Sequence, residues 1–145
     1  MFRTRYTMPI AVHLLLLRDN EILLLRRNNT GYEDGNYSVI AGHVEKGEEV
    51  MQAMAREAYE EANIDITREN LKVVGIMHRK TKSERIDFFL TAREWQGELR
   101  NKEPHKCDEL AWYPLQNLPE NTIPYVRQAI ENFQAGKWFD SFGWS

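Results

Sequence analysis

The segment from Gly42 to Ile64 constrains the chain most, because it combines a strong helical pattern with a concentration of acidic residues. It holds six carboxylates and two cations, so its formal charge is −4, whereas the charge of the whole chain is −3. Residues 49–62 are strong helix formers throughout, and they predict a helix. A solvated acidic face and a metal site are the two interpretations of this acidity.

The phases of the predicted helix favour the metal site. At about 100° per residue, its apolar side chains fill one stripe that would face a core. Glu57, Glu60 and Glu61 share an arc of roughly 100°, and Glu61 lies inside the apolar stripe. A solvated face would not carry a carboxylate there, and Glu57 and Glu61 repel each other one helical turn apart. The stripe consists of Val50, Met51, Met54, Ala55, Ala58 and Ala62.

A divalent cation would remove this difficulty. Burying carboxylate charge without a counter-charge is costly. Mg²⁺ prefers hard oxygen ligands and commonly combines a few carboxylates with waters and substrate phosphates. The sequence therefore predicts a site for one or more divalent cations on this helix.

Length and composition indicate a soluble globular protein with one domain over residues 1–145. The chain is 42% hydrophobic and 28% charged, which is ordinary for a globular protein. Its near-neutral charge gives no reason to expect membrane or wholesale nucleic-acid binding. Its one cysteine, Cys107, excludes an internal disulfide. We interpret Cys107 as a small buried side chain, expect no disulfide-linked partner, and predict a cytoplasmic location.

The apolar run at residues 8–17 follows Arg3 and Arg5 and so invites comparison with a signal peptide. His13 interrupts the run, no small-residue cleavage site follows, and the run is too short to span a bilayer. We therefore predict a buried strand. Asp19-Asn20 favours a tight hairpin between this strand and the next. In all, we expect strands at 8–18, 21–27, 37–41, 71–78, 85–92 and 110–113, helices at 49–62 and 125–134, and a tail at 136–145 without clear periodicity.

The acidic segment resembles the Nudix box. The matching residues are Gly42, Glu48 and the run Arg56-Glu57-Ala58-Tyr59-Glu60-Glu61-Ala62-Asn63-Ile64. Ala58 is smaller than the aliphatic residue usual in the family. Asn63 replaces a glycine and can still end the helix in the left-handed conformation. Upstream, Ile40-Ala41-Gly42 stands where many members have Pro-Gly-Gly, which bears on substrate fit more than on metal binding.

The resemblance covers roughly residues 8–135 and implies a Nudix-type α/β/α sandwich with a mixed β-sheet. It implies that Mg²⁺ or Mn²⁺ is bound by Glu57, Glu60 and Glu61, with the Gly42 carbonyl as a further ligand. Glu57 and Glu60 would act in catalysis through these cations. Arg56 would pair with Glu48 or its neighbours and hold the carboxylates in place.

Resemblance outside the box suggests further site residues, each with a plain structural alternative. The segment 95–103 resembles, by its spacing, a MutT-type segment whose closing glutamate is a metal ligand or catalytic base on a mobile loop, which suggests Glu103. Glu109, which precedes a tryptophan, is the competing base, and either could be a solvated loop acid. Arg26 matches a phosphate- or base-contacting arginine but could be a solvated strand end. Asn121 matches a base-contacting asparagine but could be a turn or cap residue.

Several other polar residues have no assigned role. The four histidines are scattered without ligand spacing, so we interpret them as structural. The basic turn between the strands at 71–78 and 85–92 could attract phosphates, and a soluble turn explains it equally well. The tail aromatics could line a base pocket or a homodimer interface. These sets are His13, His43, His78 and His105; Arg79, Lys80, Lys82 and Arg85; and Trp138, Phe139, Phe142 and Trp144.

The implied activity is metal-dependent hydrolysis of a diphosphate bond in a nucleoside diphosphate linked to another moiety. We expect a small-molecule nucleotide substrate, with an intact or damaged nucleoside triphosphate preferred, giving the monophosphate and pyrophosphate. Nucleotide sugars, dinucleoside polyphosphates and RNA 5′ ends are the alternatives. A nucleotide-binding regulatory module without turnover is less favoured, because all the carboxylates of the box are present.

Overall fold

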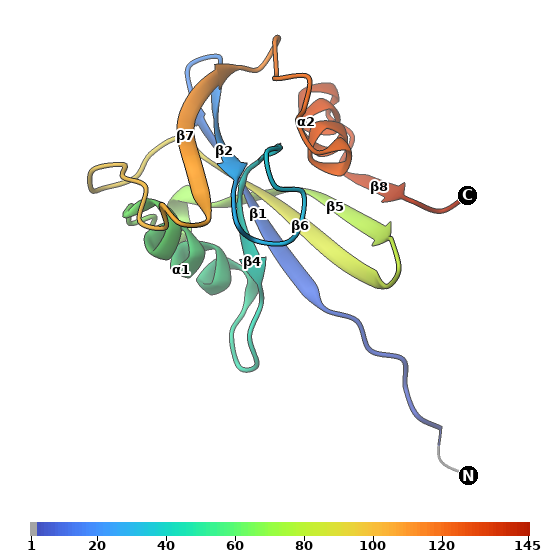
Figure 1. The fold of residues 1–145 in the computed structure, drawn as a ribbon. Coiled ribbons are helices and arrows are strands. Elements are labelled where there is room, and N and C mark those ends of the chain that lie inside the picture. Colours follow the sequence, from blue (N-terminus) through green and yellow to red (C-terminus); the bar gives the residue numbers. More distant parts are fainter. Residues whose placement is uncertain (1–2) are drawn as a thin grey trace.

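The computed structural model describes residues 3–145 as a mixed β-sheet between two helices (Figure 1). The strands run in the order β3-β2-β1-β6-β5-β8, with β4 paired to β1 and β7 paired to β2. The β1–β6 and β5–β8 pairs are parallel, and the other pairs are antiparallel. The elements are β1 Ile10–Arg18, β2 Glu21–Arg27, β3 Tyr37–Ser38, β4 Ile40–His43, α1 Val50–Ala62, a 3-10 turn Arg68–Asn70, β5 Lys72–Lys80, β6 Glu84–Ala92, β7 Cys107–Pro114, α2 Pro124–Ala135 and β8 Phe139–Phe142.

Strand β1 separates two hydrophobic cores and explains the layered arrangement. Because successive side chains of a strand point to opposite faces, Leu14 and Leu16 pack with α1, whereas Leu15 and Leu17 pack with α2. The seven central residues of β1 are all buried. The predicted α/β/α sandwich with a mixed sheet is therefore confirmed.

Helix α1 begins and ends on side-chain signals that the sequence contains. Glu49 and Gln52 form a reciprocal capping box, each side chain accepting a backbone hydrogen bond at 3.0 Å. The helix ends at Asn63, whose φ of 65° is left-handed, as predicted for the residue replacing glycine. Buried alanines, including Ala58, face the sheet. The smaller residue at that position is thus part of the close packing of the helix on the sheet.

Two expectations about the strands were incomplete. The strand predicted at 37–41 divides into β3, which pairs with β2, and β4, which pairs with β1. The tail, whose sequence shows no clear periodicity, contains β8, which adds to β5 at the edge of the sheet. Neither helix within residues 3–145 is long and apolar enough to cross a membrane.

Candidate active site

Arg56 donates hydrogen bonds to three carboxylates, two on α1 and one just before it. Its Nε and Nη2 donate to the two carboxylate oxygens of Glu48 at 2.7 and 3.0 Å. Its Nη1 donates to Glu57 at 2.7 Å and to Glu60 at 2.8 Å, and Nη2 also donates to the His43 carbonyl at 3.1 Å. The hydrogen bond from Arg56 lowers the pKa of Glu48. Hydrogen bonds to Glu48, Glu57 and Glu60 in turn raise the pKa of Arg56. The predicted pairing of Arg56 with Glu48 is confirmed.

Glu61 has the most unfavourable surroundings of the acidic residues. Its Oε2 is buried and has no hydrogen-bond partner among residues 3–145. Burial raises the pKa of the Glu61 carboxyl well above its usual value, and Glu57 and Glu103 raise it further. A hydrogen bond from the Ala41 backbone opposes this only in part. The phase prediction that Glu61 points into the apolar side of the helix is confirmed.

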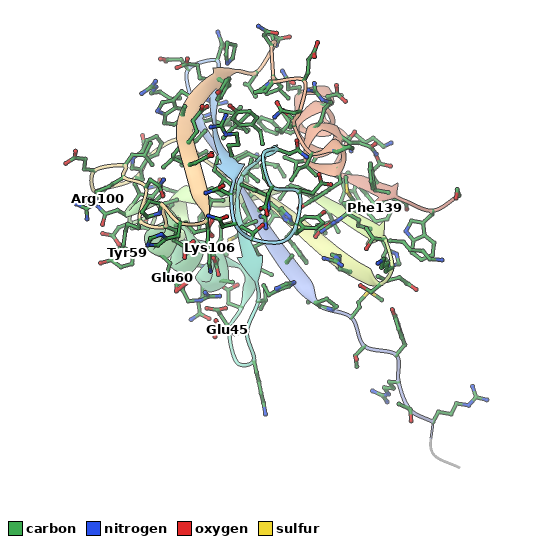
Figure 2. The ribbon with its side chains drawn as sticks, in the orientation of Figure 1. Glu45, Tyr59, Glu60, Arg100, Lys106 and Phe139 are labelled. Atoms are coloured by element: carbon green, nitrogen blue, oxygen red, sulfur yellow. The ribbon has the colours of Figure 1, made fainter. Side chains whose placement is uncertain are left out.

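Glu61 opens into a cavity of about 620 Å³. Four carboxylates and three cations line this acidic cavity, as it is called below. Glu60 of α1 and Lys106, which precedes β7, lie close together in Figure 2, with Glu45 nearby on the loop that leads into the helix. The residues that line the acidic cavity are Leu25, Arg27, Thr30, Ala41, Glu57, Glu60, Glu61, Lys102, Glu103, Lys106 and Cys107.

Glu103 reaches this cavity because its loop caps the end of α1. The backbone N–H of Arg100 donates to the Ala62 carbonyl at 2.9 Å, and that of Lys102 donates to the Glu61 carbonyl at 3.1 Å. The last carbonyls of a helix lack partners within the helix, so the loop supplies them. The loop that was expected to be mobile is therefore tied to the helix that carries Glu57, Glu60 and Glu61.

The comparison with known protein families covers α1, most of α2 and the acidic cavity. The model of the NUDIX domain matches residues 7–133. The chain belongs to the NUDIX domain family. The segment 42–64 is accordingly its Nudix box, and the acidic cavity is built on that box and on the loop that caps its helix.

Relatives and solved structures agree with the family. The chain is 35% identical over 118 residues to a protein named NAD-capped RNA hydrolase NudC from Edwardsiella ictaluri, covering 80% of this chain and 44% of that protein. It is 34% identical over 134 residues to NudC of Photorhabdus laumondii, covering 88% of this chain and 49% of that protein. The chain thus spans about half the length of these curated relatives. A MutT NUDIX hydrolase from Burkholderia pseudomallei superimposes with a TM-score of 0.79 at 26% identity, covering 87% of this chain and 98% of the other. A MutT protein from Methanosarcina mazei shares the fold, with a TM-score of 0.77 at 22% identity, covering 92% of this chain and 97% of the other.

The four carboxylates of the acidic cavity form a donor set that suits a hard divalent cation. Glu57, Glu60, Glu61 and Glu103 supply carboxylate oxygens, and Glu61 Oε2 has an unused buried lone pair. Gly42 lies against this set, since a Cβ at that position would sit 2.2 Å from the Glu57 carboxylate carbon. Within residues 3–145, no three acidic, histidine or cysteine side chains converge at ligand distances. Glu57 and Glu60 also contact Arg56, and Glu57 lies near enough to Glu61 to raise the pKa of the Glu61 carboxyl.

Glu109, the competing catalytic base, does not line the acidic cavity. Its carboxylate accepts hydrogen bonds from the hydroxyls of Tyr37, at 3.0 Å, and Tyr113. Both tyrosines pack in the core under α2, on the opposite face of the sheet from α1. Of the two candidate bases, the structure therefore brings only Glu103 to the carboxylates of the box.

Arg26 and Asn121 also lie outside this cavity, and both make structural contacts. Arg26 Nε donates to Asp108 at 2.7 Å. Asn121 Nδ2 donates to the Gly35 carbonyl at 2.8 Å, which ties the loop at 28–36 to the segment before α2. The cation that reaches the cavity from β2 is Arg27, which sequence reasoning missed.

Arg27 was missed because β2 has an irregularity at this point. The register of the β2–β7 pair shifts between Arg26 and Arg27, and a bulge re-aims the side chains that follow it. Two adjacent arginines give no sequence signal that would identify which one faces the site. Lys102 and Lys106 were missed as well, although both flank Glu103 in the sequence.

Cys107 and the tail aromatics complete the comparison with expectation. Cys107 is buried as predicted, and it also lines the acidic cavity. Phe139, on β8, lies far from Glu60 in Figure 2. None of the tail aromatics lines the acidic cavity, so the structure does not support the interpretation of the tail as a base pocket there.

Proposed function

We propose that this chain is a metal-dependent Nudix pyrophosphohydrolase that cleaves a diphosphate bond in a nucleoside diphosphate linked to another moiety. The observation that carries the proposal is the buried, unpartnered Oε2 of Glu61 in a cavity with three further carboxylates. Such an arrangement is unfavourable in the absence of a cation. Membership of the NUDIX domain family supports the same chemistry.

Glu57, Glu60 and Glu61 would hold Mg²⁺ or Mn²⁺, with Glu103 and the Gly42 carbonyl as further ligands. When bound, such a cation neutralises charge on the phosphates and lowers the pKa of water. Arg56 contributes by fixing Glu48, Glu57 and Glu60 relative to one another. It acts as a positioning residue, because its guanidinium donates to these carboxylates and to the His43 carbonyl.

The remaining residues of the cavity supply a base and a binding site for phosphates. A water molecule attacks one phosphorus, the phosphoanhydride P–O bond breaks, and Glu103 accepts the proton of the water. Arg27, Lys102 and Lys106 provide the cations that attract the substrate's phosphates. Two hydrogen bonds fix the Arg27 guanidinium in the cavity wall: its Nε donates to the Tyr32 carbonyl at 2.7 Å, and its Nη2 donates to Thr30 Oγ1 at 3.1 Å.

The substrate class has two leading candidates. A nucleoside triphosphate, intact or damaged, is the one expected from the sequence, and the MutT proteins of the same fold are consistent with it. A dinucleotide cap on RNA is the second, because the curated relatives are named NAD-capped RNA hydrolase. Nucleotide sugars and dinucleoside polyphosphates remain in the same reaction class.

A substrate panel tests the proposal. The purified chain is incubated with Mg²⁺ and nucleoside triphosphates, nucleotide sugars, dinucleoside polyphosphates or capped RNA, alongside Glu60→Gln. We expect turnover of at least one class and a loss of about 100-fold or more in Glu60→Gln, since that change removes a charged ligand. Glu131→Gln, on the exposed side of α2, is the matched control and should retain full activity. No turnover of any diphosphate, or equal turnover by Glu60→Gln, would refute the enzymatic function; tight binding without turnover would favour a regulatory module.

A further inference from the structure

A second cavity lies between the loop at 28–36 and the hairpin that joins β5 to β6. Its volume is about 420 Å³, and it shares no lining residue with the acidic cavity. Three of its lining residues are cationic, and the other three carry hydroxyls, one of them on a tyrosine ring. We call it the basic cavity, and its lining residues are Tyr32, Arg79, Thr81, Lys82, Ser83 and Arg85.

Arg79 shows that the basic cavity is more than a solvated turn. Its side chain is only 5% exposed, and its Nε donates to the fully buried carboxylate of Asp87 at 2.6 Å. Its guanidinium carbon also lies 3.6 Å from the centroid of the Tyr125 ring. A buried ion pair must overcome a large desolvation cost. The base of the hairpin therefore contains a buried, paired charge next to the exposed residues of the turn.

Lys82 and Arg85 are the cations of this cavity that remain available. Neither makes an ion pair with a carboxylate in the part of the chain that the structure describes. Arg85 Nη2 donates to Ser83 Oγ at 3.2 Å, whereas its Nε is buried and has no partner among residues 3–145. The Arg85 side chain lines the cavity, and a guanidinium matches the geometry of phosphate particularly well.

The loop at 28–36 connects the two cavities. Arg27 lines the acidic cavity, and its guanidinium carbon lies 5.2 Å from the centroid of the Tyr32 ring, which lines the basic cavity. The carboxylate of Asp34 holds the loop by accepting from the backbone N–H groups of Thr30 and Gly31, at 3.0 and 2.9 Å. The two cavities thus lie on either side of this loop.

We propose that the basic cavity binds a phosphate group of the substrate other than the diphosphate that is cleaved, with Tyr32 packing against the sugar or base that carries this phosphate. This inference rests on the proposed function, and it names the substrate more closely. The preferred substrate carries an additional phosphate on the moiety attached to the nucleoside diphosphate. A ribose phosphate of a small dinucleotide and the first phosphodiester of a capped RNA share this chemistry.

Steady-state kinetics with three matched substrates test the inference and distinguish the two sources. The substrates are a dinucleoside diphosphate, the same compound with a ribose 2′-phosphate, and the same compound as the cap of a short RNA. We expect Arg85→Ala and Lys82→Ala to raise KM about tenfold for the substrates whose additional phosphate is bound, with kcat unchanged within about twofold. KM for the unphosphorylated compound should not change. Lys72→Ala, which removes an exposed charge at the other end of β5, is the control and should leave all three KM values unchanged.

The salt dependence supplies a readout that misfolding would not reproduce. For capped RNA, each lost phosphate contact should reduce the slope of log(kcat/KM) against log[salt] by roughly 0.7. Arg85→Lys, which keeps the charge, should restore most of that slope. Equal effects of Lys82→Ala and Arg85→Ala on all three substrates would mean that the cavity holds a part common to all of them, and the inference would be wrong. Unchanged KM values throughout would refute it as well.

A binding measurement keeps this inference separate from the proposed function. Inorganic phosphate is titrated into the protein and the amide chemical shifts are followed by NMR. EDTA is present so that no cation is bound in the acidic cavity, whose carboxylates then repel phosphate. Shifts are expected at Thr81, Lys82 and Ser83, and they should be lost in the double variant Lys82→Ala/Arg85→Ala. If no substrate is turned over but these shifts occur, the proposed function fails and the anion site stands. Absence of these shifts in the wild-type protein would overturn the anion site whatever the kinetics.

Discussion

Replacing Glu61 by glutamine is expected to stabilise the metal-free protein while removing its activity. Burial, together with Glu57 and Glu103, raises the pKa of the Glu61 carboxyl above its usual value of 4.5. The folded state therefore binds this proton more tightly than the unfolded state does. As a result, the stability contributed by protonation is present at low pH and is lost as the pH rises through the folded pKa. Glutamine has the same shape and no charge, so it does not lose stability over this range.

The size of the effect follows from the unpartnered Oε2 atom. A buried polar atom without a partner costs about 1–3 kcal/mol, and more when it is charged. For a chain of 145 residues, a change of this size corresponds to a Tm shift of about 3–9 °C. The advantage of Glu61→Gln should be greatest near pH 8 and should shrink toward pH 4.5, where the wild-type carboxyl becomes protonated in both states.

Thermal unfolding in EDTA and in Mg²⁺ at several pH values measures this effect. In EDTA, Glu61→Gln should melt higher than the wild type. Mg²⁺ should raise the Tm of the wild type more than that of the variant, because a ligand that binds the folded state stabilises it by mass action. Glu131→Gln should follow the wild type under all conditions. A lower Tm of Glu61→Gln in EDTA at pH 8, or an advantage that does not change with pH, would refute this account of Glu61.

Three further predictions address the same site and the core. Arg56→Lys should reduce kcat by about tenfold or more, because a lysine keeps the charge but cannot hold Glu48 through two hydrogen bonds; a kcat equal to that of the wild type would contradict the positioning role. Gly42→Ala should raise the Mg²⁺ concentration needed for half-maximal activity, since the new Cβ would displace the Glu57 carboxylate; metal titration of activity and the circular dichroism spectrum separate this effect from misfolding. Burial lowers the pKa of His13 to about 4, from 6.5. The unfolded state therefore binds the proton more tightly than the folded state. As the pH drops from about 6.5 to about 4, the free energy of unfolding should fall by up to about 3 kcal/mol. Urea unfolding of His13→Leu should show a weaker pH dependence over the same range.

The parts of the site on α1 could be predicted from the sequence because helical periodicity is a local property. The phases alone placed Glu61 on the apolar side, and the substitution at Asn63 preserved a left-handed helix end, as the structure confirms. The resemblance to the Nudix box then supplied the fold. These predictions needed only the spacing of residues within one helix and the loop before it.

The parts that depend on strand register and non-local pairing could not be predicted. Whether Arg26 or Arg27 faces the site depends on a register shift against β7. The choice between Glu103 and Glu109 depends on how the loop of Glu103 packs on the end of α1 and on which face of β7 carries Glu109. One residue of shift in a strand exchanges its faces. Strand β8 forms only because β5 offers an open edge more than sixty positions earlier in the chain. No local pattern in a four-residue strand reports such a partner.

The backbone contacts between the 95–106 loop and the end of α1 have a consequence for how the chain would lose the proposed activity. Opening of the last helical turn would break the hydrogen bonds from Arg100 and Lys102, and so would release Glu103 in the same event. Local unfolding of this kind requires less free energy than global unfolding. Amide hydrogens at Arg100 and Lys102 should therefore exchange together, and a cation bound by Glu61 and Glu103 should slow both. We expect heat or denaturant to inactivate the chain by separating this loop from the end of α1, before the sheet itself unfolds.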